Sequence, residues 1–292
     1  MKLDAKVISL YGATASGKSS LALRIAQELG NVIIINADSR QVYKEVPIIT
    51  AQPKLDDKNK LYGIISLKDD FSVAHWLQFV KKEIIAASDK KIILVGGTGL
   101  YLDSLMNGLS EVPEIADDLY IKLQKRLESE GWDSLYKELL SQDPTRKILP
   151  QDKQRLIRAL AVLEGTGKSL TFWQQKSREP LLEESQLVKI WLKPSRDLLY
   201  KNINERFLQM LELGALEEAA KLQNWAELPK IIGLQEILGY LKGDFTKEDM
   251  IKTAQQKTRN YAKRQETWFK NRFNPDLILH DYLLKELPEV LF

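Results

Sequence analysis

The chain has no cysteine and only two histidines, His75 and His280, among its 292 residues. The absence of cysteine excludes disulfides, thiolate zinc sites and a cysteine nucleophile. Two isolated histidines also argue against a histidine metal cluster and against Ser–His catalysis. A functional site must therefore be built from Asp, Glu, Lys, Arg, Ser and Thr side chains and from main-chain groups.

Long hydrophobic runs are also missing. The longest apolar stretches, such as Val32–Ile35 and Ile92–Val95, are far too short to span a bilayer. A strand-like stretch begins within a few residues of Met1, so we expect no secretory signal. With 44% apolar and 28% charged residues the composition is that of a globular protein. We expect a cytoplasmic protein with no membrane partner.

Three short, mostly apolar runs predict strands that are buried on both faces of a parallel sheet. They are Val7–Tyr11, Val32–Asn36 and Lys91–Val95. Helical periodicity lies between them, from Lys18 to Leu29 and from a capping Ser72 to about Ala87. This alternation predicts an α/β fold, a parallel sheet flanked by helices, with ligands at the carboxyl ends of the strands.

The pattern changes after Pro113, where charged amphipathic helices replace the strands. A strand pattern returns at Leu187–Leu192. We therefore predict a catalytic core formed by residues 1–112 and 187–292, and an all-helical insertion at 113–186. The expected helices are Asp117–Glu130, Ser134–Leu140 and Asp152–Leu163 in the insertion, then Asp197–Leu213 and Thr246–Phe273 in the core. Thr246 and Asp249 form a capping box at the start of the last helix, and Asn274-Pro275 ends it.

A phosphate-binding loop (P-loop) follows the first strand: Gly12-Ala13-Thr14-Ala15-Ser16-Gly17-Lys18-Ser19. Its glycines let main-chain N–H groups converge on phosphate oxygens, at the positive end of the following helix. Lys18 supplies a positive charge, and the Ser19 hydroxyl is a candidate Mg²⁺ ligand. The alternative is a tight turn that only caps the helix. A second Gly-Lys-Ser, at Gly167–Ser169, has Val162 where the first glycine belongs, and we interpret it as a helix end and turn.

Polar residues follow two further strands at the same edge of the sheet. Asp38 can act there as a general base or hold Mg²⁺ through water, and its alternative is a helix cap for Ser39–Tyr43. The Thr98 hydroxyl can donate to a leaving phosphate oxygen, although a plain turn is the common interpretation. Arg206 would by default form a surface ion pair.

Two basic stripes indicate a polyanionic partner such as RNA. Between Lys252 and Arg272 seven basic residues and several aromatic residues accompany one acid, and between Arg146 and Arg158 five basic residues accompany one acid. The alternative is a solvated helix face with aromatic residues packed behind it.

Several motifs in one order carry a resemblance over almost the whole chain. After the P-loop come Asn36–Tyr43 (NADSRQVY), Gly96–Tyr101 (GGTGLY), Gln154–Leu160 (QRLIRAL), Ile203–Leu211, Thr258-Arg259, Ala262–Gln265 (AKRQ) and Thr267–Phe269 (TWF). Asp-Ser-x-Gln-Val-Tyr and Lys-Arg-Gln-x-Thr-Trp are uncommon among P-loop proteins. The chain resembles the tRNA dimethylallyltransferases.

The resemblance implies that N6 of an adenosine beside the anticodon attacks dimethylallyl diphosphate and that pyrophosphate leaves. It implies that Asp38 deprotonates the amine and that Thr98 donates to the leaving oxygen. The developing charge would be neutralised by Lys18, Arg206, and Mg²⁺ held at Ser19. The acceptor base should be flipped out of its stack. Contacts to the tRNA anticodon loop are implied for Asp38, Ser39, Arg40, Gln41, Thr98, Gln154, Arg155 and Arg158. A compact bacterial form, acting as a monomer, is expected.

The chain departs from the family pattern in places. Pro47–Pro53 (PIITAQP) stands where the family has Asp-Ile-Gly-Thr-Ala-Lys-Pro, and Tyr120 stands where relatives often have an arginine. Leu61–Ile64 and Leu234-Gln235 also differ from the usual residues.

Two rival functions remain open. One is a P-loop kinase or a prenyltransferase acting on a free adenine nucleotide, against which the basic stripes count. The other is a nucleotide-dependent RNA-binding switch, which would need an Asn-Lys-x-Asp that the sequence lacks.

Overall fold

The computed structural model describes residues 7–54, 56–87, 89–176, 178–225 and 227–283. The chain divides into two compact units, Met1–Met106 with Pro180–Phe292, and Asn107–Glu179. The second unit begins and ends before the boundaries of 113 and 186 that the sequence suggested. The reason lies in the returning segment, where the Leu181 N–H donates to the Leu105 carbonyl at 3.0 Å and Leu182 is buried in the core beside the sheet.

Among the described residues, the first unit contains a six-stranded parallel sheet in the order β3-β2-β4-β1-β5-β6. The strands are β1 (Val7–Gly12), β2 (Val32–Asn36), β3 (Asn59–Lys60), β4 (Lys91–Gly96), β5 (Leu187–Leu192) and β6 (Leu277–Leu279). The predicted class, a P-loop-type parallel sheet flanked by helices, is confirmed. The two short edge strands, β3 and β6, were not predicted.

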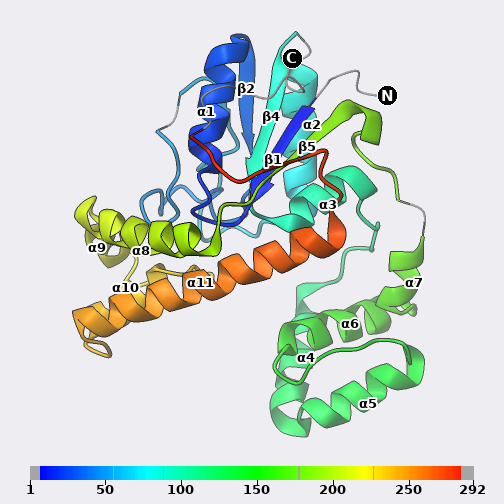
Figure 1. The fold of residues 1–292 in the computed structure, drawn as a ribbon. Helices are drawn as coiled ribbons and strands as arrows, with labels where there is room; N and C mark the ends of the chain where they lie inside the picture. Colours follow the sequence, from blue (N-terminus) through cyan, green and yellow to red (C-terminus); the bar gives the residue numbers. More distant parts are fainter. Residues whose placement is uncertain (1–6, 55, 88, 177, 226, 284–292) are drawn as a thin grey trace. The chain divides into compact units, whose positions relative to one another are not determined.

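Helices cover both faces of this sheet because each central strand is apolar on both sides. On one face α1 (Lys18–Leu29) buries Leu21 and Ile25 against Ile8 and Leu10 of β1. On the other face lie α2 (Val73–Ala86), capped by the Ser72 hydroxyl, and α3 (Gly99–Asn107) (Figure 1). Each large side chain buried in this way contributes about 1.5–3 kcal/mol of hydrophobic stabilisation.

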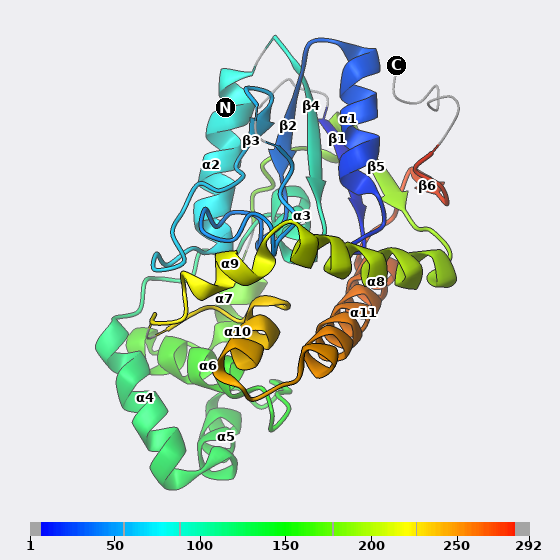
Figure 2. The same cartoon turned by 90° about the vertical axis from the view of Figure 1, so that its left-hand side faces the viewer.

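A helical layer lies across the end of the sheet to which the strands point (Figure 2). It comprises α8 (Arg196–Glu212), α9 (Ala215–Ala220), α10 (Leu234–Lys242) and α11 (Lys247–Arg272). The Thr246 hydroxyl accepts the Asp249 N–H at 3.1 Å and caps α11, as predicted. The far end of α11 is anchored by Phe269 and Phe273, which pack beside the sheet. A 3₁₀ turn, η1 (Glu184–Gln186), precedes β5.

In the described residues of the second unit the regular structure is helical: α4 (Asp117–Glu130), α5 (Trp132–Gln142), α6 (Lys153–Thr166) and α7 (Leu170–Gln175). Its core contains fully buried Leu123, Leu135 and Leu156. The second Gly-Lys-Ser is the predicted helix end, with Gly167 at φ 67° after α6 and Ser169 capping α7. Within the described residues, no helix has the length and apolarity needed to cross a membrane.

Candidate active site

The P-loop joins β1 to α1 in a conformation that only its glycines permit. A Cβ on Gly12 would overlap the Leu192 carbonyl at the end of β5, and Gly17 adopts a left-handed φ of 95°. Within the loop the Lys18 ammonium donates to the Ala13 carbonyl at 2.6 Å. The loop is therefore wrapped around its own lysine, with Ser19 exposed in the first turn of α1.

Helix α8 holds the loop from one side. Arg206 donates from Nη2 to the Thr14 hydroxyl at 2.6 Å, and Asn202 donates from Nδ2 to the Ala15 carbonyl at 3.2 Å. The two side chains are four residues apart, so they share one helix face. Arg206 thus lies in the site and not in the surface ion pair that its local sequence favoured. Asn202 was not predicted, although its spacing of four residues from Arg206 could have revealed it.

Helix α11 holds the same loop through a single buried amide, for which no role was predicted. The Thr14 N–H donates to Gln265 Oε1 at 2.8 Å, and Gln265 Nε2 donates to the Gly97 carbonyl at 2.8 Å. Gln265 is only 5% exposed. It therefore fixes the P-loop relative to the turn after β4.

Asp38 and Thr98 follow β2 and β4 at this edge, as predicted. Asp38 Oδ1 accepts the Arg40 N–H at 2.9 Å, in a turn and not at a helix start. The alternative of a helix cap for Ser39–Tyr43 is therefore wrong. The Thr98 hydroxyl accepts the Ser39 N–H at 2.9 Å and donates to the Ser39 hydroxyl at 3.2 Å, which ties the two strand ends together.

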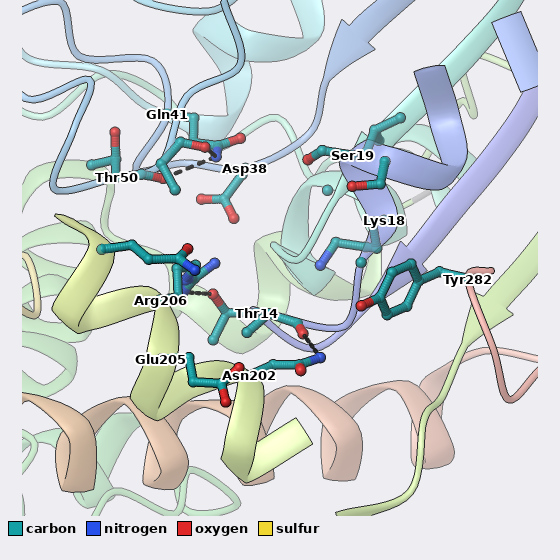
Figure 3. A pocket seen from close by; sticks show the side chains of 17 residues that line it. Thr14, Lys18, Ser19, Asp38, Gln41, Thr50, Asn202, Glu205, Arg206 and Tyr282 are labelled. Atoms are coloured by element: carbon teal, nitrogen blue, oxygen red, sulfur yellow. Dashed lines mark hydrogen bonds between the residues drawn. The ribbon is translucent and has the colours of Figure 1, made fainter. Parts of the chain in front are cut away.

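A cavity of about 390 Å³ opens between the P-loop, the segment after β2 and α8 (Figure 3). The predicted site residues that line it are Thr14, Ala15, Gly17, Lys18, Ser19, Asp38, Gln41 and Arg206. Gly12, Ala13 and Ser16 are buried and form the framework beneath it. Tyr282, from the segment after β6, also lines the cavity and was not anticipated.

Burial makes the cations of this cavity receptive to an anion. It lowers the pKa of Lys18 from 10.5 to about 8, with the Arg206 charge acting in the same direction and the Asp38 charge opposing both. Burial likewise lowers the pKa of Arg206, and Asp38 again opposes this shift. Poorly solvated cations gain more from an incoming phosphate than cations in water do. Lys18 and Arg206 therefore form a pair of cations suited to a diphosphate, although Asp38 and Glu205 line the same cavity.

The segment that departs from the family pattern forms one wall of the cavity. The buried Glu218 carboxylate of α9 accepts the N–H groups of Ile48 and Ile49 at 2.9 and 2.8 Å. Gln41 Nε2 donates to the carbonyls of Thr50 and Ala51 at 2.9 and 2.8 Å. Side chains from α9 and from the segment after β2 thus hold this wall in place, although its own residues differ from the family pattern.

A second cavity, of about 350 Å³, adjoins the first and shares Thr14, Asp38, Thr50 and Arg206 with it. Its remaining lining is less polar. It includes Ile49, Ile231, Ile232 and Tyr261, with Arg40, Lys230, Thr258 and Arg264 at its sides. Burial raises the pKa of Tyr261, so its phenol stays neutral. The isoleucines and Tyr261 offer faces for packing a planar organic group, and the surrounding cations suit one that is attached to a phosphate backbone.

The predicted RNA-contacting residues of the second unit lie on α6. Gln154 and Arg155 are exposed, and Arg155 Nε lies 3.0 Å from Asp152 Oδ2. Arg158 donates to the Tyr120 hydroxyl, and its guanidinium lies 5.9 Å from the centre of the Tyr120 ring. The tyrosine that replaces the family arginine thus packs with an arginine of the neighbouring helix. A role of these residues in RNA binding stays a prediction.

Comparison with known proteins agrees with this geometry. A family model described as IPP transferase matches residues 41–272. A tRNA dimethylallyltransferase of Ehrlichia canis (strain Jake) is 43% identical over 94% of each chain, and one from Bartonella henselae is 42% identical over 92% of this chain and 97% of that one.

Solved structures give the same result. The tRNA isopentenylpyrophosphate transferase of Bacillus halodurans superposes with a TM-score of 0.65 at 31% identity, over 94% of this chain and 89% of that one. A eukaryotic dimethylallyltransferase captured acting on tRNA gives a TM-score of 0.76 at 28% identity, over 91% and 70%. The resemblance inferred from the motifs is confirmed, and the chain belongs to the IPP transferase family.

Proposed function

We propose that this chain transfers the dimethylallyl group of dimethylallyl diphosphate to N6 of an adenosine next to the anticodon of tRNA and releases pyrophosphate. One observation carries this proposal: the P-loop cavity, which holds Lys18 and Arg206, adjoins a second cavity with apolar and aromatic walls through Asp38 and Arg206. A bisubstrate transfer needs two such compartments, with the bond that breaks lying between them.

The P-loop cavity binds the diphosphate of the donor. Its main-chain N–H groups, Lys18 and Arg206 surround the volume in which the diphosphate is placed. As the allylic carbon–oxygen bond breaks, negative charge grows on the departing pyrophosphate, and the fixed cations stabilise that charge more than they stabilise the bound donor. The Thr98 hydroxyl, which donates to Ser39 in the structure, would exchange that partner for the leaving oxygen once the donor is bound.

The second cavity receives the acceptor adenosine. An adenine amino group is a poor nucleophile, so most of the rate gain comes from positioning and from removal of its proton. Asp38 lines both cavities and accepts that proton as the new nitrogen–carbon bond forms. The neutral Tyr261 and the apolar Ile231 and Ile232 offer faces against which a flipped base packs.

Magnesium fits the donor cavity. Ser19 presents an exposed hydroxyl beside the phosphate volume, while no cluster of three or more His, Asp or Glu occurs among the described residues. Mg²⁺ in proteins often takes few protein ligands and completes its shell with substrate phosphates and water. When bound, it supplies further neutralisation of the diphosphate. We assign Ser19 as its protein ligand.

The RNA-binding surface that we propose for the first unit lies on α11. Lys263, Arg264, Lys270 and Arg272 are exposed on this helix, and Arg264 also lines the second cavity. By contrast, Lys257 is paired with the buried Glu236 at 2.7 Å. The exposed group lies on the part of α11 that holds the P-loop, so RNA bound there is close to the chemistry.

We further propose that the chain acts as a monomer in the cytoplasm, where tRNA and the donor meet.

The direct test is to incubate the chain with tRNA, Mg²⁺ and dimethylallyl diphosphate, and to analyse the nucleosides of the digested tRNA by mass. Parallel reactions replace the tRNA with AMP, or the donor with ATP. We expect a prenylated adenosine from tRNA only. Prenylated AMP without prenylated tRNA would indicate a prenyltransferase that acts on a free nucleotide. A phosphorylated product would indicate a kinase.

A further inference from the structure

We propose that Tyr282 makes the phosphate site selective against nucleotides, because its ring fills the space through which a nucleoside would leave the P-loop. The inference rests on the proposed function. A P-loop by itself binds any di- or triphosphate, so the site must distinguish a prenyl diphosphate from ADP and ATP by what is attached to the phosphates.

The two cavities give the phosphate site a direction. Asp38 and Arg206 line both cavities, whereas Gly17, Ser19 and Tyr282 line only the first. Figure 3 shows Asp38 and Tyr282 on opposite sides of Lys18, with the tyrosine side chain reaching toward the P-loop. The reacting end of the donor therefore faces Asp38, and the far phosphate faces Tyr282.

The direction separates the two classes of ligand. In dimethylallyl diphosphate the carbon chain leaves toward the second cavity, and the far phosphate carries nothing that must pass Tyr282. A nucleotide bound with its terminal phosphate at the reacting end extends its ribose and base in the other direction. That path crosses Gly17 and meets the tyrosine ring.

The ring is held in place by packing and by the strand before it. It lies against Gly17, where even a Cβ would overlap its carbons. It also packs on the apolar cluster at the α1 face of the sheet. The preceding strand, β6, is fixed by Lys193, whose N–H donates to the Leu279 carbonyl at 2.7 Å and whose carbonyl lies 2.9 Å from His280 Nδ1. A nucleoside must displace a packed side chain to enter.

The test compares binding of ADP with Mg²⁺ by titration calorimetry to the wild type and to Tyr282→Ala, Tyr282→Leu and Tyr282→Phe. Leu283→Ala is the matched control, because Leu283 is the next residue, is 70% exposed and does not line the cavity. We expect the Ala and Leu variants to bind ADP about tenfold tighter or more, the range that steric exclusion from a pocket gives. The Phe variant and the control should match the wild type, and dimethylallyl diphosphate binding should change less than about threefold in all of them.

Unchanged ADP affinity in the Ala and Leu variants would overturn the inference, as would an equal gain in the Phe variant. Thermal melts identify any variant that fails to fold, and the Leu variant, which keeps apolar packing, then decides. Prenyl transfer by the wild type is measured separately. Its absence would reject the proposed function, while ADP affinity still reports on the ring.

Discussion

Replacement of Asp38 by asparagine tests the central step of the proposed chemistry. Asparagine has the same shape and retains Oδ1, so the hydrogen bond from the Arg40 N–H, 2.9 Å long in the structure, can persist. The turn after β2 should therefore survive. The lost function is acceptance of the amine proton, and removal of a general base costs about 10²–10⁴ in rate, or about 2.7–5.5 kcal/mol of transition-state stabilisation.

The substitution has a second, electrostatic effect that must be separated from the first. The Asp38 charge raises the pKa of Lys18, which stands at about 8 because of burial. Loss of that charge lowers the pKa of Lys18 further, so the ammonium loses its proton at a lower pH than in the wild type. The variant should then begin to lose donor affinity at a lower pH than the wild type, whose Lys18 has a pKa of about 8.

The assay is single-turnover transfer at about pH 6.5 and pH 8.5, with a thermal melt alongside. At the lower pH Lys18 is protonated in both proteins, so the remaining rate deficit reports the missing base. Asp56→Asn is the matched control, since Asp56 Oδ1 accepts the Lys58 N–H at 2.9 Å in the same kind of turn on the exposed surface. A variant rate within about threefold of the wild type at low pH would refute Asp38 as base. Partial rescue by high magnesium would instead assign it to metal positioning.

Three further predictions concern Gln265, Lys18 and the arginines of α6. Gln265→Ala removes a buried hydrogen bond to Gly97 and a part-buried one to Thr14, and leaving a buried partner unpaired costs about 1–3 kcal/mol. The melting temperature and donor affinity should both fall, and an unchanged melt would contradict the bridge. Lys18→Ala should weaken donor binding by calorimetry, and prenyl transfer at the wild-type rate would exclude Lys18 from the site. Arg155→Glu and Arg158→Glu should weaken tRNA binding, with a salt-dependent affinity and unchanged donor affinity, relative to Lys137→Glu on α5. Equal losses in all three variants would indicate net charge alone.

The sequence predicted those parts of the molecule whose signal is local. The P-loop is a continuous motif between a strand and a helix, and the central strands are apolar runs, so both were found. Helix α11 was found from its cap and its stop. These elements depend on neighbours within about one turn or one strand, which is the range that sequence patterns report.

The sequence did not reveal features that depend on distant partners. The short strands β3 and β6 exist only because they pair with the edges of an existing sheet. Gln265 and Tyr282 are an ordinary amide and an ordinary aromatic until the fold brings them to the P-loop. The second cavity likewise arises from segments that local periodicity does not connect. The helix cap proposed for Asp38 failed because β2 is followed by a turn.

The contacts that hold the P-loop also determine when in biosynthesis the site can form. Thr14 is bonded to side chains 192 and 251 residues later in the chain, on α8 and α11. At about 5–20 residues per second, a ribosome needs about 12–50 s to make the interval between Thr14 and Gln265. Until α8 is made the loop is complete in sequence but lacks both partners, and until α11 is made it still lacks the Gln265 bridge. A nascent or prematurely ended chain therefore cannot present the finished donor site, and catalytic competence appears only when synthesis of α11 is nearly complete.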